Sequence, residues 1–250
     1  MNLINLVELG FIALFFIVLM VFALVIRKRP ERRLREIPAF ARLGRSIGLA
    51  VEAGKRVHVS LGYGGVNDIP GASGVVGLTM LQRIARAASI SDQPPIASSG
   101  EGALGILSQD TLRSAYQAIR SENSYDPIYG QITGLTPLSY AAGTLPIIFD
   151  QQVSTSVLAG HFGTEVALIV DANERSGNQT MAGSDSLDAQ AIMYATTPDP
   201  LIGEELYAGG AYLNAGLMHQ ASLRTQDAMR WIIIFGIIVG SLLKLMRVIP

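Results

Sequence analysis

The sequence predicts an α/β protein: a Rossmann-like, mostly parallel sheet with helices on both faces, flanked by N- and C-terminal transmembrane helices. Two observations lead to this fold class. The 250 residues are 49% hydrophobic, with a formal net charge of −1, and the apolar residues are concentrated at the two ends. Between the ends, short strand-like runs alternate with longer runs at helical spacing, which favours parallel strands connected by helices.

The N-terminal segment is the longest apolar run of the chain. Residues 9–26, LGFIALFFIVLMVFALVI, carry no charge. About twenty helical residues cross a hydrocarbon core of about 30 Å. No basic residue precedes the run, whereas a signal peptide would begin with one. A basic block follows it instead, formed by Arg27, Lys28, Arg29, Arg32, Arg33 and Arg35. We therefore expect a membrane anchor over residues 1–27.

A second apolar segment lies at the C-terminus. Residues 231–243 read WIIIFGIIVGSLL, between Arg230 and Lys244. Alone, this stretch would also fit a buried or interfacial helix, but further apolar positions up to residue 249 favour a transmembrane helix over 225–250. Because the basic block follows the first span, the positive-inside rule places the intervening domain in the cytoplasm. We expect an inner-membrane protein with both termini outside.

The region between the spans is expected to hold one domain. Residues 28–56 begin with charges and continue with apolar residues at helical spacing, which predicts a basic, amphipathic connecting helix. A cytoplasmic α/β domain is expected over 57–224. Its predicted strands lie at 57–61, 95–98, 128–135, 146–150, 165–171 and 189–195. Its predicted helices lie at 75–89, 108–122, within 137–158, and at 200–217.

A glycine-rich stretch, SLGYGGVNDIPGASGVVG, follows the first predicted strand at residues 60–77. A dinucleotide fingerprint requires G-x-G-x-x-G directly after that strand and a carboxylate at the end of the second strand. The glycine spacing differs here, and the second strand ends in Ala97-Ser98-Ser99. The chain also lacks the G-K-[ST] of a phosphate-binding loop. NAD and P-loop sites are therefore disfavoured, and no cofactor is expected.

Several predicted strands end in small, backbone-exposing loops, at 62–74, 98–105, 132–138, 171–179 and 196–200. Ligands bind at the carboxyl ends of strands in open parallel sheets, and exposed amides can bind an anion. The same loops also fit tight turns where helices pack closely. The candidate ligand-binding residues are Gly62, Gly64, Gly65, Gly71, Ser73, Gly74, Ser99, Gly100 and Asp171. Asp171 also fits an N-cap or Asx turn.

No catalytic constellation is evident in the sequence. The absence of cysteine excludes disulfides and a thiol nucleophile. The three histidines are His58, His161 and His219. His161 and Glu165 are four residues apart, but Gly163 lies between them and Glu165 is predicted to begin a strand. No metal site and no catalytic residue is therefore assigned, and enzymatic activity stays open.

Two stretches carry a resemblance to a known family. They are His58-Val59-Ser60-Leu61-Gly62 and Pro200-Leu201-Ile202-Gly203-Glu204-Glu205, together with the flanking apolar segments. They resemble a family of bacterial membrane proteins known only as a domain of unknown function. The resemblance implies two terminal transmembrane helices around a cytoplasmic α/β domain. It brings no activity and no catalytic residues.

Two functions are compatible with these patterns. The first is a non-enzymatic, membrane-anchored subunit of a homo- or hetero-oligomeric complex, with the lipid bilayer, further copies of itself or other membrane subunits as partners. The alternative is a membrane-tethered domain that binds or processes a small anionic ligand, such as a nucleotide, at its glycine-rich loops. The nearly neutral charge balance gives no reason to expect nucleic acid.

Overall fold

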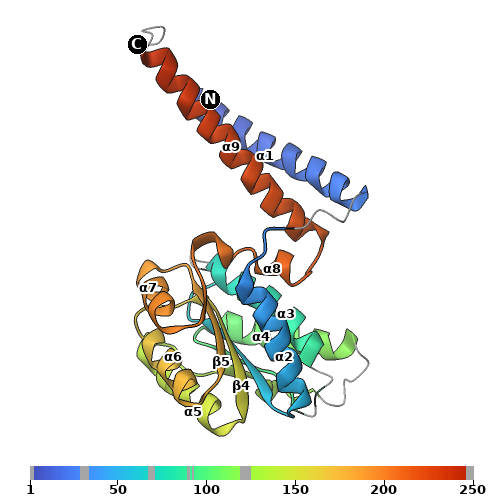
Figure 1. Cartoon of the computed structure of the whole chain (residues 1–250), viewed down its shortest axis with the longest axis vertical. Helices are drawn as coiled ribbons and strands as arrows, with labels where there is room; N and C mark the ends of the chain where they lie inside the picture. Colours follow the sequence, from blue (N-terminus) through green and yellow to red (C-terminus); the bar gives the residue numbers. More distant parts are fainter. Residues whose placement is uncertain are drawn as a thin grey trace. The chain divides into compact units, whose positions relative to one another are not determined.

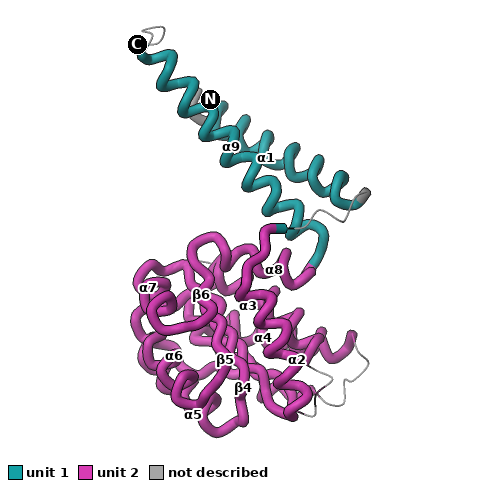
Figure 2. Tube along the Cα trace, in the orientation of Figure 1, with its two compact units in different colours: residues 1–34, 216–250 teal, residues 35–215 magenta. Residues whose placement is uncertain are grey.

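The computed structural model describes residues 3–28, 34–66, 71–88, 91, 93–118 and 125–245. They form two compact units, one from the two ends of the chain (1–34 and 216–250) and one from its middle (35–215), coloured separately in Figure 2. The α/β unit therefore includes the segment from residue 35 onward. It ends nine residues before the predicted boundary at 224.

The terminal unit consists of two long helices, α1 (Leu3–Lys28) and α9 (Leu217–Leu245), which pack against each other in opposite directions (Figure 1). Both are long and apolar enough to cross a membrane. The C-terminal helix begins earlier than residue 225, because the polar stretch LMHQASLRTQ already belongs to its first turns.

The middle unit is built on a six-stranded sheet in the order β3-β2-β1-β4-β5-β6, and every neighbouring pair is parallel. The chain winds outward from β1 to β3, returns to place β4 beside β1, and then winds outward in the other direction. The strands are β1 (Arg56–Gly62), β2 (Ile96–Ser99), β3 (Gly130–Ile132), β4 (Val153–His161), β5 (Gln179–Ser184) and β6 (Asp199–Leu201).

Helices cover both faces of this sheet (Figure 1). One face packs against α2 (Pro38–Glu52), α3 (Gly71–Ala88) and α4 (Gly102–Ala118), with α8 (Gly209–Tyr212) beside α3. The other face packs against α5 (Pro137–Asp150), α6 (Val166–Arg175) and α7 (Leu187–Thr196). Two short 3-10 helices lie at Pro127–Tyr129 and Gly203–Glu205. The α/β class with a parallel sheet is thus confirmed.

The segment predicted as a connecting helix packs on the sheet. Phe40, Leu43 and Ile47 of α2 are buried in the same core as the strand residues Val57 and Val59. The apolar face of this helix is therefore buried within the α/β unit. The basic block before it includes residues 29–33, which lie outside the described residues.

Two predicted strands are wrong, because residues 165–171 and 189–195 lie mainly in helices α6 and α7. In α6, Val166, Ile169, Val170 and Asn173 are buried, which is a helical spacing. Consecutive apolar residues in VALIV conceal that period, so that a helix and a buried strand look alike in sequence. Residues 146–150, a further predicted strand, form the last turns of α5.

The sequence prediction missed three strands, β4, β5 and β6. Their sequences, VSTSVLAGH, QTMAGS and DPL, contain many small or hydroxyl-bearing residues and few large apolar ones. As a consequence, the loops at 171–179 and 196–200 precede β5 and β6 and lie at the amino edge of the sheet. The loops after β1, β2 and β3 lie at the carboxyl edge, as predicted.

Candidate functional site

The carboxyl ends of the two central strands lie directly beside each other. Gly62 of β1 is in register with His161 of β4. The Tyr63 N–H donates to the His161 carbonyl oxygen over 3.1 Å, and the Gly100 N–H donates to the Gly62 carbonyl oxygen over 2.8 Å. The ends of β1, β2 and β4 are therefore fixed to one another where the winding direction of the sheet changes.

Glycine is required at two positions of this junction. Gly62 has φ +72°, in the left-handed region, and a Cβ atom there would overlap the His161 backbone. A Cβ atom at Gly160 would overlap the Leu61 carbonyl group. Both glycines permit close approach of β1 and β4. This is the structural alternative that the sequence left open for the glycine-rich loop.

The glycines that begin α3 are also closely packed. A Cβ atom at Gly71 would lie 2.5 Å from the Gly65 carbonyl oxygen, and one at Gly74 would lie 3.0 Å from a Leu104 methyl group. Ser73 is fully buried between them. Residues 67–70 of this loop lie outside the described residues. Ligand binding at Gly65, Gly71, Ser73 and Gly74 stays a prediction.

The end of β2 is covered by an aromatic side chain. A Cβ atom at Gly100 would lie 2.5 Å from Tyr63 Cβ. Gly64 and Ser99 are buried as well, and the Ser99 hydroxyl donates to the Gln131 carbonyl oxygen over 3.4 Å. These residues lie at the edge where they were predicted to be, but their surroundings are packed side chains.

Asp171 lies elsewhere. It is on the solvent-exposed face of α6, where its Oδ2 atom is 2.8 Å from Nε of Arg175, one helical turn later. The expected position of Asp171 at a strand end is wrong, because the segment that was predicted as a strand is a helix.

A buried chain of hydrogen bonds runs along β1 under α5. His58 Nε2 lies 2.9 Å from Ser98 Oγ, and Ser98 Oγ lies 3.4 Å from the Tyr140 hydroxyl. The same hydroxyl bonds to Ser60 Oγ and accepts from the Gly62 N–H over 3.2 Å. Tyr140 therefore connects α5 to the end of β1 and helps to hold Gly62 in its left-handed conformation.

Burial keeps this network uncharged. It lowers the pKa of His58 from 6.5 to about 4. Burial also raises the pKa of Tyr140, against the opposing effect of its hydrogen bonds. The Nδ1 atom of His58 has no hydrogen-bond partner among the described residues. A neutral, enclosed imidazole of this kind supports the fold.

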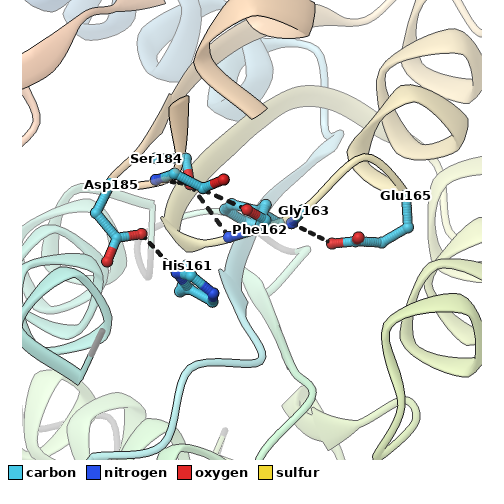
Figure 3. A network of polar contacts seen from close by, with 7 residues as sticks. His161, Phe162, Gly163, Glu165, Ser184 and Asp185 are labelled. Atoms are coloured by element: carbon cyan, nitrogen blue, oxygen red, sulfur yellow. Dashed lines mark hydrogen bonds and ion pairs between the residues drawn. The ribbon is translucent and has the colours of Figure 1, made fainter. Parts of the chain in front are cut away.

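A different set of polar side chains gathers at the carboxyl ends of β1, β4 and β5, and we refer to Tyr63, His161, Glu165 and Asp185 as the carboxyl-edge cluster. His161 Nδ1 is 2.7 Å from Asp185 Oδ1 (Figure 3). Next to this pair, the Phe162 N–H donates to Ser184 Oγ over 3.1 Å. The ends of β4 and β5 therefore hold the imidazole and the carboxylate together.

Tyr63 completes the cluster from the β1 side. Its ring meets the His161 imidazole edge to face, with ring centroids 5.3 Å apart. A Cβ atom at Gly163 would be 2.9 Å from the Tyr63 hydroxyl and 2.7 Å from Glu165 Oε2. The Gly163 N–H donates to Glu165 Oε1 over 2.7 Å (Figure 3). The phenol hydroxyl and the carboxylate thus both lie close to Gly163, where a side chain would collide with them.

The electrostatic field at the cluster is negative. The pKa of Tyr63 is raised by burial first and then by the carboxylates of Glu165 and Asp185. The pKa of Tyr207 is raised by burial and by Asp185. Both phenols therefore stay protonated and can donate hydrogen bonds. In the described part of the chain, no three His, Asp or Glu side chains are grouped so that they could hold a metal ion.

The sequence alone does not bring these four residues together. The spacing of His161 and Glu165 suggests only a possible metal pair, and the strands that end at His161 and Ser184 are not recognisable in the sequence. The available signal was polar residues at the ends of two short segments, HFGTE and SDS. That signal becomes visible only once the segments before them are recognised as strands.

Fold and site together define a parallel α/β domain with a polar cluster where its two central strands end, in a chain with two apolar terminal helices. The chain belongs to the family described as Domain of unknown function (DUF6754), whose sequence model matches residues 2–249. The predicted resemblance to a family of unknown function is confirmed by this match. No curated protein and no solved structure matches the chain.

Proposed function

We propose that this protein is a membrane-anchored subunit whose Rossmann-like domain binds a small, uncharged, polar ligand at the carboxyl-edge cluster. The observation that carries the proposal is the position of the cluster. The strand order 3-2-1-4-5-6 is that of dinucleotide-binding Rossmann domains, and such sheets bind ligands where the strand order reverses. Tyr63 and His161 lie at that reversal, at the ends of β1 and β4.

The charges around the cluster favour an uncharged ligand over an anion. Burial raises the pKa of Tyr63 most, and Glu165 and Asp185 raise it further, so their negative field reaches the site. The Leu104 N–H at the start of α4 donates to Glu101 Oε2 over 2.8 Å, so a carboxylate already neutralises the positive end of this helix. Carboxylates accept hydrogen bonds and phenols donate them, which suits hydroxyl or amide groups. The nucleotide alternative is correspondingly less favoured.

The proposed anchoring rests on the surfaces of α1 and α9. Large apolar side chains such as Phe16, Ile17, Phe235 and Ile237 are 60–70% exposed, which is costly in water and favourable in lipid. The basic block at 27–35 supports the proposal that the α/β domain lies on the cytoplasmic side of a bacterial inner membrane. Reporter domains fused to the two termini test this topology. The proposal requires that both reporters lie outside the cytoplasm.

Ligand binding is tested by thermal unfolding of the full-length protein in mild detergent. The panel comprises uncharged sugars and nucleosides together with their phosphorylated forms, such as adenosine and ATP. A ligand at 100 times its Kd stabilises the folded state by about 2.7 kcal/mol. We expect an uncharged compound to raise the Tm of the wild type and of Tyr194→Ala, an exposed control on α7, but not that of Tyr63→Ala. No shift from any uncharged compound, or a shift retained in Tyr63→Ala, would contradict the proposal.

A second candidate function is self-assembly as a scaffold in the membrane plane. It is favoured by exposed apolar side chains around the edge strand β3. They lie on α4, the 3-10 helix Pro127–Tyr129, β3, the loop to α5 and the first turn of α5: Ile106, Ile128, Ile132, Leu135 and Leu138. A second copy of the chain is the proposed occupant. Light scattering in mild detergent should show an oligomer that Leu135→Glu with Leu138→Glu dissociates and that Leu49→Glu, an exposed control on α2, leaves intact. A monomeric wild type at native membrane density excludes this candidate.

A further inference from the structure

His161 has the geometry of an oriented base. A carboxylate only accepts hydrogen bonds at neutral pH, so Nδ1 of His161 must donate to Asp185 Oδ1 over their 2.7 Å contact. In the neutral ring the remaining nitrogen, Nε2, then carries the lone pair. The side chains of His161 and Asp185 are 25% and 18% exposed, so the pair is partly open to solvent. The imidazole is thus held in one tautomer at an accessible strand end.

We propose that the carboxyl-edge cluster hydrolyses uncharged carboxylic esters, with His161 as general base, Asp185 as its positioning residue and the Tyr63 hydroxyl as donor to the carbonyl oxygen. The inference rests on the proposed ligand site and assigns its substrate class. An imidazole oriented by a carboxylate is the recurring arrangement for removing a proton from an attacking oxygen. Figure 3 shows the His161–Asp185 pair at the ends of β4 and β5.

The charged residues of the carboxyl-edge cluster also favour one class of substrate over another. Glu165 and Asp185 repel phosphorylated and carboxylate-bearing substrates, whereas an ester is neutral. Burial and the two carboxylates raise the pKa of Tyr63, so its hydroxyl stays protonated and can donate a hydrogen bond to an ester carbonyl oxygen. A hydrogen bond to the carbonyl oxygen that strengthens as charge develops there contributes to catalysis of acyl transfer.

The reaction balances with water as the second substrate. The oxygen of a water molecule bonds to the carbonyl carbon while His161 Nε2 takes one of the water protons. The negative charge that develops on the carbonyl oxygen accepts a hydrogen bond from Tyr63. The bond from carbon to the alcohol oxygen then breaks, and Nε2 returns its proton to that oxygen. The products are a carboxylic acid and an alcohol, and the enzyme is unchanged.

The probe is p-nitrophenyl acetate, and its hydrolysis is followed with the full-length protein in mild detergent. Exposed imidazoles attack this ester without a site, so His219→Gln, which removes an exposed histidine of α9, is the matched control. We expect saturable hydrolysis that His219→Gln preserves and that His161→Gln lowers about 10²-fold in kcat. Asp185→Asn should lower kcat and change its pH profile, with partial recovery in Asp185→Glu. Equal rates in the wild type and His161→Gln would overturn the inference.

A non-hydrolysable probe separates this inference from the proposed function. In 4-nitrophenylacetone a CH₂ group replaces the ester oxygen, so the compound can bind without reacting. If His161→Gln loses hydrolysis while the ketone raises the Tm of the wild type and of His161→Gln equally, the result supports His161 as the general base. If the ketone binds the wild type but no saturable hydrolysis occurs, the catalytic inference fails and the ligand site stands. If the Tm also fails to respond to the ketone and to the uncharged panel, both proposals fail.

Discussion

His58 and His161 lie on adjacent parallel strands and have opposite environments. His58 is in the middle of β1, fully buried under α5, and its pKa is lowered to about 4. His161 is the last residue of β4, partly exposed and hydrogen-bonded to Asp185. The difference follows from position along the strand. Helices cover both faces of the middle of a parallel sheet, whereas its carboxyl edge ends in loops.

The comparison shows why residue type alone is a poor guide to function in this chain. Both histidines belong to runs of small and apolar residues, VHVSLG and VLAGHFG. His58 supports the fold through Ser98 and Tyr140, whereas His161 contacts Tyr63 and Asp185 at the ends of two other strands. Four predictions test how far the two environments depend on their surroundings, from the largest expected effect to the smallest.

The close approach of β1 to β4 brings Tyr63 against His161, and Gly62→Ala should disrupt it. The substitution combines a left-handed backbone with overlap at the His161 backbone, and should cost about 4 kcal/mol of unfolding free energy. Gly54→Ala is the matched control, because Gly54 also has positive φ but no atom lies within 4 Å of its Cβ position. Denaturant unfolding in mild detergent should show a loss of about 1 kcal/mol for the control. Equal losses of unfolding free energy in Gly62→Ala and Gly54→Ala would show that the close contact of Gly62 with the His161 backbone adds nothing to the cost of the substitution.

The buried His58 should make the unfolding free energy depend on pH in the acidic range. The unfolded chain takes up a proton on His58 near pH 6.5, whereas the folded protein does so only near pH 4, so the stability contributed by neutral His58 is complete above pH 6.5 and is lost as pH falls toward 4. The loss amounts to about 3 kcal/mol. Unfolding free energies measured between pH 7 and pH 4 should fall more steeply for the wild type than for His58→Met. Parallel curves would show that His58 is not a buried neutral group.

Tyr140→Phe tests how much the Tyr140 hydroxyl stabilises the end of β1. Removing the hydroxyl leaves Ser60 and the Gly62 N–H without this partner in a buried region, which should cost about 2 kcal/mol. Chemical denaturation would measure it, with the exposed Tyr194→Phe expected to stay within about 0.5 kcal/mol of the wild type. A neutral result for Tyr140→Phe would indicate that the hydroxyl does not hold the end of β1.

The smallest effect is expected at Asp171, one of the candidate ligand-binding residues that the sequence suggested. Asp171→Asn removes an exposed pair with Arg175 one helical turn away and should cost at most about 0.5 kcal/mol. Neither p-nitrophenyl acetate hydrolysis nor stabilisation by uncharged ligands should change. A marked loss of hydrolysis or of ligand stabilisation in Asp171→Asn would indicate that Asp171 belongs to the site. It would contradict the assignment of Asp185 as the carboxylate of the site.

The sequence predicted part of the carboxyl edge correctly. Gly62, Gly64, Ser99 and Gly100 do lie there, because β1 and β2 are apolar enough to be recognised and glycine punctuates their ends. Their surroundings were not predictable, since nothing local indicates that Tyr63 covers Gly100. The other half of the edge was missed with β4 and β5, whose polar composition is compatible with strands only because helices and neighbouring strands bury them.

Features that depend on local periodicity and length could be predicted from the sequence. These are two terminal helices long and apolar enough to cross a membrane, an α/β class for the middle, and the helices after the first two strands. The remaining features depend on contacts between segments that are distant in the sequence. Whether the segment VALIV forms a strand or a helix depends on which of its side chains are buried against the rest of the fold. His161 and Asp185 are 24 residues apart and meet only because parallel pairing aligns the ends of β4 and β5.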